Sequence, residues 1–209
     1  MNKIDFQQCI DFLGERFQKP LPGPEAHKKL SPPHRHIPDI ATLKNHRNSS
    51  VMLLVQNKNN IPHLIFIERA DDGHVHSGQI ALPGGKVEMH DKDLLATALR
   101  ETKEEIGIHE NKVQLLGKLS PLYIPPSNFL VNPFTGFVAD EIIFSPDKKE
   151  VKQILEIPLS DFFKDDVVNF AAEHKTHRGI VKAPCYELHG VKIWGATCMI
   201  VTEFLSLFE

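Results

Sequence analysis

The distribution of hydrophobic residues predicts a helix near the N-terminus, within residues 3–18. Apolar side chains recur there at the spacing of one helix face: Ile4, Cys9, Leu13 and Phe17. Six prolines follow between residues 20 and 38, and proline interrupts helices and inner strands alike. We therefore expect residues 1–38 to form an N-terminal appendage and residues 39–209 to form one domain. The appendage packs either on this domain or on a second copy of the chain, and the pattern leaves both arrangements open.

Short apolar runs separated by turns predict a sheet in the rest of the chain. The predicted strands are 51–55, 63–67, 113–119, 134–139, 151–157 and 181–188. The clearest helical pattern covers residues 91–106, and we expect Asp91 to cap its start and Gly107 to end it in a left-handed conformation. A second helix is expected at 196–208, and the proline-rich residues 121–129 are expected to form a loop. This order of elements predicts an α/β fold with a central mixed sheet.

Composition narrows the class of protein. The net charge of −3 offers no basic field for nucleic acid, and the apolar runs are too short to span a bilayer. The three cysteines, Cys9, Cys185 and Cys198, are odd in number and widely spaced, which favours a reducing compartment. We therefore expect a cytoplasmic protein that binds neither nucleic acid nor membrane and that is a monomer or homodimer.

Three acidic residues are neighbours on the predicted helix at 91–106. They are three or four positions apart or adjacent: Glu101, Glu104 and Glu105. Apolar positions at helical spacing define the face that seats the helix on the sheet: Leu95, Leu99, Thr102 and Ile106. Converging carboxylates repel one another, and a hard divalent cation removes that repulsion. The alternative to a metal site is a solvated acidic face paired with Arg100 and Lys103. The glycine pair before the helix and Gly107 after it stand at fixed offsets from the acids, and this combination favours the metal site.

Residues 100–108, RETKEEIGI, match the second half of the Nudix box, and Gly85 matches its opening glycine. Thr102 departs from the aliphatic residue of the pattern, the usual intervening glutamate is missing, and the spacing is one residue longer, with Asp91 nearby. The chain thus resembles Nudix hydrolases. The resemblance implies an α/β/α sandwich and hydrolysis, dependent on Mg²⁺ or Mn²⁺, of a nucleoside diphosphate linked to another group.

A second similarity concerns the substrate. Residues 65–70 and 78–85, together with the lengthened box, resemble the branch of the family that cleaves coenzyme A. His74 stands where that pattern has arginine, and the similarity continues through 123–133 and 193–197. The resemblance implies cleavage of coenzyme A or acyl-coenzyme A to 3′,5′-ADP and 4′-phosphopantetheine or its acyl form. ADP-ribose, NADH, dinucleotides and oxidised nucleotides are alternative substrates, and a catalytically inactive ligand-sensing module is a further alternative.

The resemblance also implies roles for individual residues. Glu101, Glu104 and Glu105 are expected to hold the metal ions, with the Gly85 carbonyl as a further oxygen ligand. Glu101 is the first choice as base, Glu104 shares in catalysis, and Arg100 is expected to orient a neighbouring glutamate. Two acids outside the box are candidates for a fourth carboxylate: Glu141 and Glu150.

Substrate contacts are expected around the same segment. Gly84 lets the backbone approach phosphate closely. The 3′-phosphate of coenzyme A requires positive charge, for which Arg69 is the best candidate, with Lys86, His74 and His76 as further candidates. Side chains of the proline-rich loop either shape the substrate pocket or cover the core: Ser127, Asn128 and Phe129.

Overall fold

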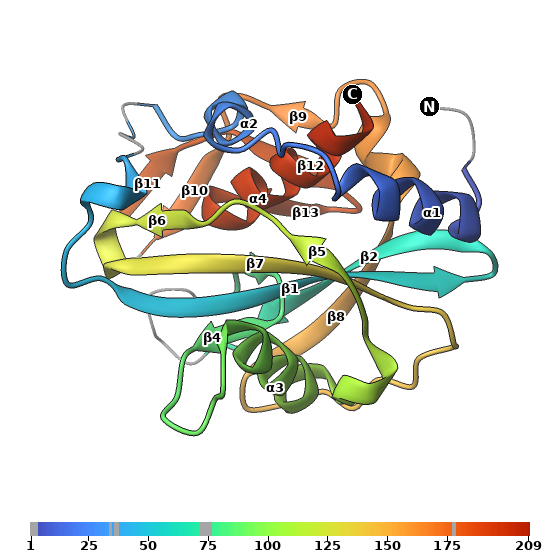
Figure 1. Ribbon diagram of the computed structural model, residues 1–209. Helices are drawn as coiled ribbons and strands as arrows, with labels where there is room; N and C mark the ends of the chain where they lie inside the picture. Colours follow the sequence, from blue (N-terminus) through green and yellow to red (C-terminus); the bar gives the residue numbers. More distant parts are fainter. Residues whose placement is uncertain (1–3, 34, 36–37, 72–76, 177–178) are drawn as a thin grey trace.

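A mixed sheet forms the centre of the protein in the computed structural model, which describes residues 4–33, 35, 38–71, 77–176 and 179–209 (Figure 1). Its strand order is β3-β2-β1-β7-β5, with β4 beside β1, β6 beside β7 and β8 beside β2. These strands are β1 (Arg47–Lys58), β2 (Ile61–Arg69), β3 (Ile80–Ala81), β4 (Gly84–Lys86), β5 (Gln114–Lys118), β6 (Leu122–Ile124), β7 (Phe129–Val138) and β8 (Val151–Pro158). The pair β1–β7 is parallel, whereas β1–β2 and β1–β4 are antiparallel. The predicted mixed sheet is therefore confirmed.

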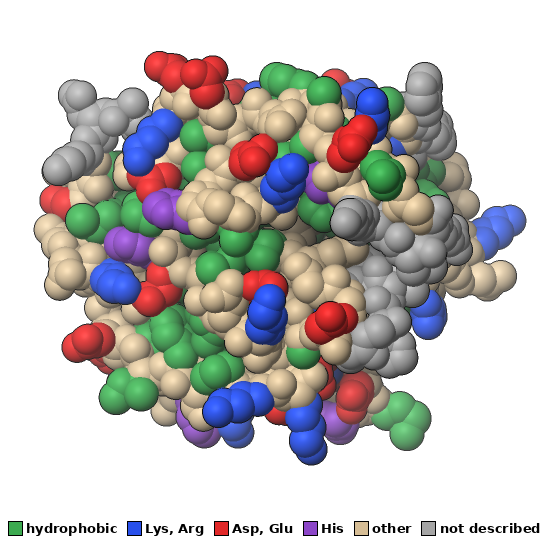
Figure 2. All heavy atoms as spheres, turned by 180° about the vertical axis from the view of Figure 1, so that it is seen from behind, with side chains coloured by type: hydrophobic (Ala, Val, Ile, Leu, Met, Phe, Trp, Pro, Cys, Tyr) green, Lys and Arg blue, Asp and Glu red, His purple; other side chains and the backbone are tan. Residues whose placement is uncertain are grey.

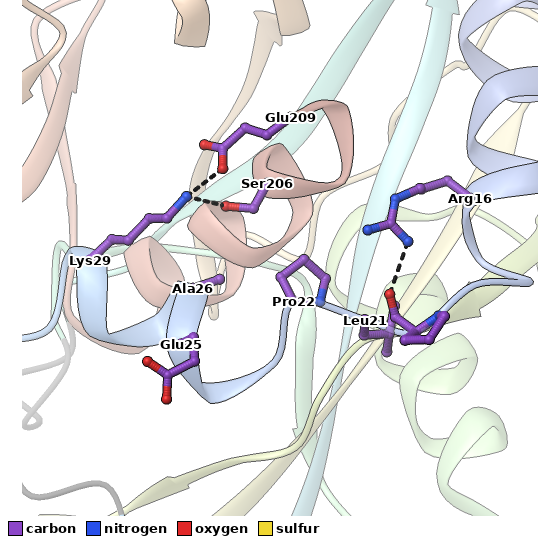
Figure 3. A pocket seen from close by; sticks show the side chains of 9 residues that line it. Arg16, Leu21, Pro22, Glu25, Ala26, Lys29, Ser206 and Glu209 are labelled. Carbon is purple, nitrogen blue, oxygen red and sulfur yellow. Dashed lines mark hydrogen bonds and ion pairs between the residues drawn. The ribbon is translucent and has the colours of Figure 1, made fainter.

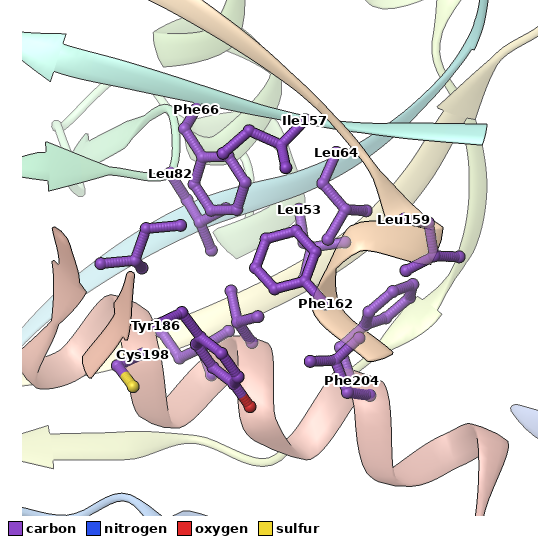
Figure 4. Close-up of a cluster of buried hydrophobic side chains, with 14 of the residues drawn as sticks. Leu53, Leu64, Phe66, Leu82, Ile157, Leu159, Phe162, Tyr186, Cys198 and Phe204 are labelled. Atoms are coloured by element: carbon purple, nitrogen blue, oxygen red, sulfur yellow. The ribbon is translucent and has the colours of Figure 1, made fainter. Parts of the chain in front are cut away.

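Helices cover both faces of this sheet (Figure 1). They are α1 (Phe6–Arg16), α2 (Pro24–Lys29), α3 (Leu94–Ile106) and α4 (Gly195–Leu205). Alternate residues of β1 face opposite sides: Leu53 packs in the core with α1 and α4, and Met52 packs in the core beneath α3. Figure 4 shows the first core, to which the sheet contributes Phe66 and α4 contributes Phe204. The arrangement is the α/β/α sandwich that the resemblance implied.

Two smaller sheets complete the fold. One is the hairpin of β10 (Glu173–Thr176) and β11 (Gly179–Lys182), and the other contains β9 (Val168–Asn169), β12 (Cys185–Leu188) and β13 (Val191–Trp194). The single strand predicted at 181–188 is thus wrong, because the segment is divided between β11 and β12 at Pro184, which has no N–H for a ladder. The proline-rich segment predicted as a loop contains β6, which pairs with β7.

Helix α3 begins at Leu94, and its N-cap is Asp93, whose carboxylate accepts a hydrogen bond from the Ala96 N–H at 2.7 Å. The prediction that Asp91 caps this helix is therefore wrong. Gly107 ends the helix with φ of 80°, as predicted, and its N–H donates to the Lys103 carbonyl. The helix is held on the sheet by a face that includes five buried side chains: Thr97, Ala98, Thr102, Glu105 and Ile106.

The N-terminal residues pack on the same core as the sheet. Asp5 caps α1 in a capping box with Gln8, and the buried face of α1 joins the core shared with α4. Farther along, the buried His27 Nε2 lies 2.9 Å from Glu203 Oε2 of α4. Of the two arrangements left open, packing on the domain of the same chain is the one that residues 4–33 adopt, while the domain boundary at residue 38 stays a prediction.

The surface carries both signs of charge. Figure 2 shows acidic, basic and hydrophobic side chains interspersed over the face seen from behind. No helix in the described part of the chain is both long enough and apolar enough to cross a membrane.

Replacement of Leu13 by alanine tests whether α1 belongs to the folded unit. Leu13 is fully buried in the core between α1 and the sheet, so we expect Leu13→Ala to lower the free energy of unfolding by about 2–5 kcal/mol in a single denaturant transition. Glu15→Ala, at an exposed position of the same helix, is the control and changes stability by less than about 0.5 kcal/mol. A separate early transition of α1, with the main transition unshifted, would contradict this account.

Candidate active site

Two glycines of β4 bring helix α3 against the strand backbone. A Cβ atom on Gly84 would lie 2.3 Å from the Ser50 carbonyl oxygen, and one on Gly85 would lie 2.2 Å from Glu101 Oε1. The Gly84 N–H donates to Glu105 Oε2 at 2.9 Å. Because no side chain intervenes, two carboxylates of α3 sit directly on the backbone of β4.

Arg100 organises the exposed side of this cluster. Its Nη1 donates to Glu101 Oε1 and to Glu104 Oε2, both at 2.9 Å. Its Nη2 donates to the Lys86 carbonyl at 3.0 Å, so the guanidinium also ties α3 to β4. Charge-assisted bonds of this kind fix orientation as well as adding energy. Arg100 thus holds the carboxylates of two glutamates, Glu101 and Glu104.

Asp91 is the buried partner that holds Arg100 in place. Its carboxylate accepts hydrogen bonds from Arg100 Nε at 2.9 Å and from Arg100 Nη2 at 3.0 Å. The Glu88 N–H and the Thr97 hydroxyl donate to it as well. The hydrogen bond from Arg100 is the main reason that the pKa of Asp91 lies well below its usual range. Sequence reasoning missed this role, although Asp91 stood where the box lacks its usual acid.

Glu105 and Glu101 are carboxylates in an unfavourable environment. Burial raises the pKa of Glu105 to about 8; the Gly84 N–H and Arg69 oppose this shift, while Glu101 and Glu150 add to it. Burial also raises the pKa of Glu101, against the opposing effect of Arg100. A positive charge placed among these groups would therefore stabilise their ionised forms.

The structure brings together most of the predicted site residues. Arg69 Nη1 of β2 lies 3.6 Å from Glu105 Oε1. Glu104 is 58% exposed on the solvent side, whereas Glu105 is 2% exposed and faces the sheet, so the three acids do not share one solvent-facing side. The Lys86 side chain is exposed and only its carbonyl contacts Arg100.

The structure gives less information on the candidates for a fourth carboxylate and on the two candidate histidines. Of the two candidates for a fourth carboxylate, Glu150 is close enough to affect the pKa values of Glu101 and Glu105. Glu141 is exposed and contributes to neither shift. The candidates His74 and His76 lie outside the described residues.

The chemistry of the donor set fits a hard divalent cation. Carboxylate and carbonyl oxygens are the ligands that Mg²⁺ and Mn²⁺ favour. The raised pKa values of the buried carboxylates indicate that the surrounding residues supply too little positive charge to offset their burial. Ser50 pairs with Gly85 in the sheet, and its buried hydroxyl has no hydrogen-bond partner among the described residues. This hydroxyl is therefore available to a further polar group. No three acidic, histidine or cysteine side chains of the described residues already stand as a ligand set, and the Glu104 carboxylate is bonded to Arg100.

A cavity of about 380 Å³ lies elsewhere, between α2 and the C-terminal residues (Figure 3). It is lined by Arg16, Lys29, Ser206 and Glu209, among others, and Lys29 Nζ donates to Ser206 Oγ and Glu209 Oε2. None of the residues that line it belongs to the carboxylate cluster.

Acidic side chains on one helix, set against the two glycines of β4 and held by an arginine, form one carboxylate cluster. The NUDIX domain family model matches residues 44–177. The chain is 34% identical over 204 residues to the protein named "Uncharacterized Nudix hydrolase NudL" of Yersinia pestis (strain Pestoides F), with 96% of each chain covered. It is 33% identical over 199 residues to the protein of that name from Photorhabdus laumondii, with 92% of this chain and 94% of the relative covered.

A crystal structure titled as a MutT/nudix family protein from Enterococcus faecalis has the same fold, with a TM-score of 0.50 and 16% identity. The alignment covers 98% of this chain and 72% of that one. The chain belongs to the Nudix family. It is a pyrophosphatase that acts on nucleoside diphosphate derivatives.

Replacement of Gly85 by alanine tests the contact between strand and helix. The new methyl group would collide with the Glu101 carboxylate, which is the flexible end of a side chain, so we expect the protein to fold but the carboxylate to move. Activity on its best substrate should fall by about 100-fold or more, with the denaturation midpoint little changed. Gly14→Ala in α1, where a Cβ meets nothing within 4 Å, is the matched control with unchanged activity. Full activity in Gly85→Ala would show that the position of Glu101 is not critical.

Proposed function

We propose that this enzyme cleaves the diphosphate of coenzyme A or acyl-coenzyme A. The observation that carries the proposal is the 3.6 Å separation of Arg69 Nη1 from Glu105 Oε1. Arg69 belongs to the segment that resembles the coenzyme A-cleaving branch, and Glu105 belongs to the Nudix box. The two resemblances thus concern one site. The segment at 78–85, which also resembles the coenzyme A-cleaving branch, contributes Gly84 to that site.

The metal would be held by Glu101, Glu104 and Glu105, with the Gly85 carbonyl as a further ligand. When bound, Mg²⁺ or Mn²⁺ neutralises diphosphate charge and lowers the pKa of water. Glu104 is the most exposed of the three acids, so its side chain is free to turn toward the cluster once it leaves Arg100.

The residues of the chain supply the remaining steps. Glu101 accepts the proton of the attacking water, and Arg100, itself fixed by Asp91, keeps that carboxylate in position. The water oxygen forms the new bond to phosphorus while the bond between that phosphorus and the bridging oxygen breaks. The products are 3′,5′-ADP and 4′-phosphopantetheine, or its acyl form. Arg69 and Lys86 bind the phosphate groups, because cations complement their charge, and Gly84 has no side chain to keep them from the backbone.

Turnover of a set of nucleotides tests both the reaction and the substrate. Purified protein is incubated with coenzyme A, ADP-ribose or NADH, with Mg²⁺ or Mn²⁺ and with chelator, and the products are separated by chromatography. We expect metal-dependent release of 4′-phosphopantetheine to be the fastest reaction and Glu105→Gln to reduce it by about 1,000-fold, since this change removes a buried charge at the reaction centre. Glu110→Gln, an exposed position beyond the end of α3, is the control and should retain wild-type activity.

Faster cleavage of ADP-ribose or NADH would contradict the coenzyme A assignment while leaving the pyrophosphatase reaction in place. Undiminished turnover by Glu105→Gln would contradict the role given to the carboxylate cluster.

A further inference from the structure

Arg47, at the start of β1, is held in place by the proline-rich segment at residues 121–129. Its guanidinium carbon lies 4.1 Å from the centre of the Phe129 ring, and its Nη2 donates to the Ser127 carbonyl at 2.7 Å. Its backbone N–H donates to the Asn128 carbonyl at 2.9 Å. A side chain fixed in this way loses little conformational entropy when it binds an anion.

The positive charge of Arg47 is not neutralised by the described residues. Arg69 and Arg100 have carboxylate partners, but Arg47 forms no ion pair within the part of the chain that the structure describes. A guanidinium has five N–H donors, and the Ser127 carbonyl accepts from only one nitrogen of Arg47. Donors therefore remain for a ligand at this exposed position.

The register of the sheet places Arg47 beside the catalytic end of β4. Ser49 is opposite Lys86, and Ser50 is opposite Gly85. Arg47 is therefore diagonal to Lys86 on the same face, at a distance of about 7–8 Å that long side chains span. It is also three residues, or about 10 Å of strand, from the position opposite Gly85. Because side chains alternate along a strand, Arg47 and Lys86 lie on the face of the sheet opposite the one on which Gly85 meets Glu101. The two cations thus flank the glycines of β4 from the other face.

The geometry points to a phosphate-binding subsite at Arg47, assisted by Lys86, for the 3′-phosphate on the ribose of the substrate. This inference rests on the proposed function, because the 3′-phosphate distinguishes coenzyme A from ADP-ribose and NADH. The 3′- and 5′-phosphates are attached to the same sugar, so a subsite for the second must lie one ribose away from the diphosphate. The proline-rich loop acts in substrate selection by holding Arg47, rather than by touching the reacting atoms.

Dephospho-coenzyme A lacks only the 3′-phosphate, so a comparison of the two substrates isolates the subsite. For the wild type we expect kcat/KM to be about 10- to 100-fold higher for coenzyme A, the effect of one or two charge-assisted contacts. Arg47→Gln should remove this preference by lowering kcat/KM for coenzyme A alone, and Arg47→Lys should restore part of it. Arg16→Gln is the control, since Arg16 is also an arginine bonded to a carbonyl, that of Pro20, although it is partly buried, and it should keep the full preference.

An equal fall in kcat/KM for both substrates in Arg47→Gln would overturn the subsite and leave the proposed function standing. The absence of a preference in the wild type would do the same. Cleavage of neither substrate would overturn the proposed function. Calorimetric binding of adenosine 3′,5′-bisphosphate and of 5′-AMP, with Mg²⁺, is independent of turnover. Tighter binding of the bisphosphate that Arg47→Gln abolishes would support the subsite, and equal binding of the two nucleotides would overturn it.

Discussion

The close approach of helix α3 to the backbone of β4 is the constraint on which the site depends. The Glu101 carboxylate rests where a Cβ atom on Gly85 would otherwise lie, and the Glu105 carboxylate accepts a hydrogen bond from the Gly84 N–H. The sheet supports this contact, because β4 pairs with β1 and β1 pairs in parallel with β7 through the middle of the core. The acids are thereby fixed on regular elements rather than on a loop, which gives catalytic groups a defined position.

Charge balance follows from the same packing. Arg100 neutralises part of the cluster and is itself fixed by Asp91, while Glu105 is buried with only Arg69 and the Gly84 N–H to offset its charge. Such a site is costly without further positive charge. A bound cation would offset the charge of Glu105, and the partly exposed Glu104 is the carboxylate whose position is least constrained by packing.

The sequence predicted those parts of the fold that depend on local pattern. The apolar runs that predicted β1, β2 and β8, the helical repeat of α3 and the glycine at its end all have short-range causes, and they were confirmed. Asp91 was misassigned because a capping aspartate and a buried partner of Arg100 look alike in sequence; the difference is a contact nine residues away. Arg47 could not be recognised either, since its neighbour Phe129 is 82 positions along the chain and meets it only through the parallel pairing of β1 with β7.

Anomalous diffraction from crystals grown with Mn²⁺ tests the central claim most directly, because it locates the cation without reference to any substrate. The account predicts manganese bound by carboxylate oxygens of Glu101 and Glu105 beside the Gly85 carbonyl, with Glu104 turned away from Arg100 to join them. Crystals of Glu105→Gln should lose that density. Manganese bound only elsewhere on the protein, with Glu101 and Glu105 still engaged solely by Arg100, Arg69 and the Gly84 N–H, would contradict the account.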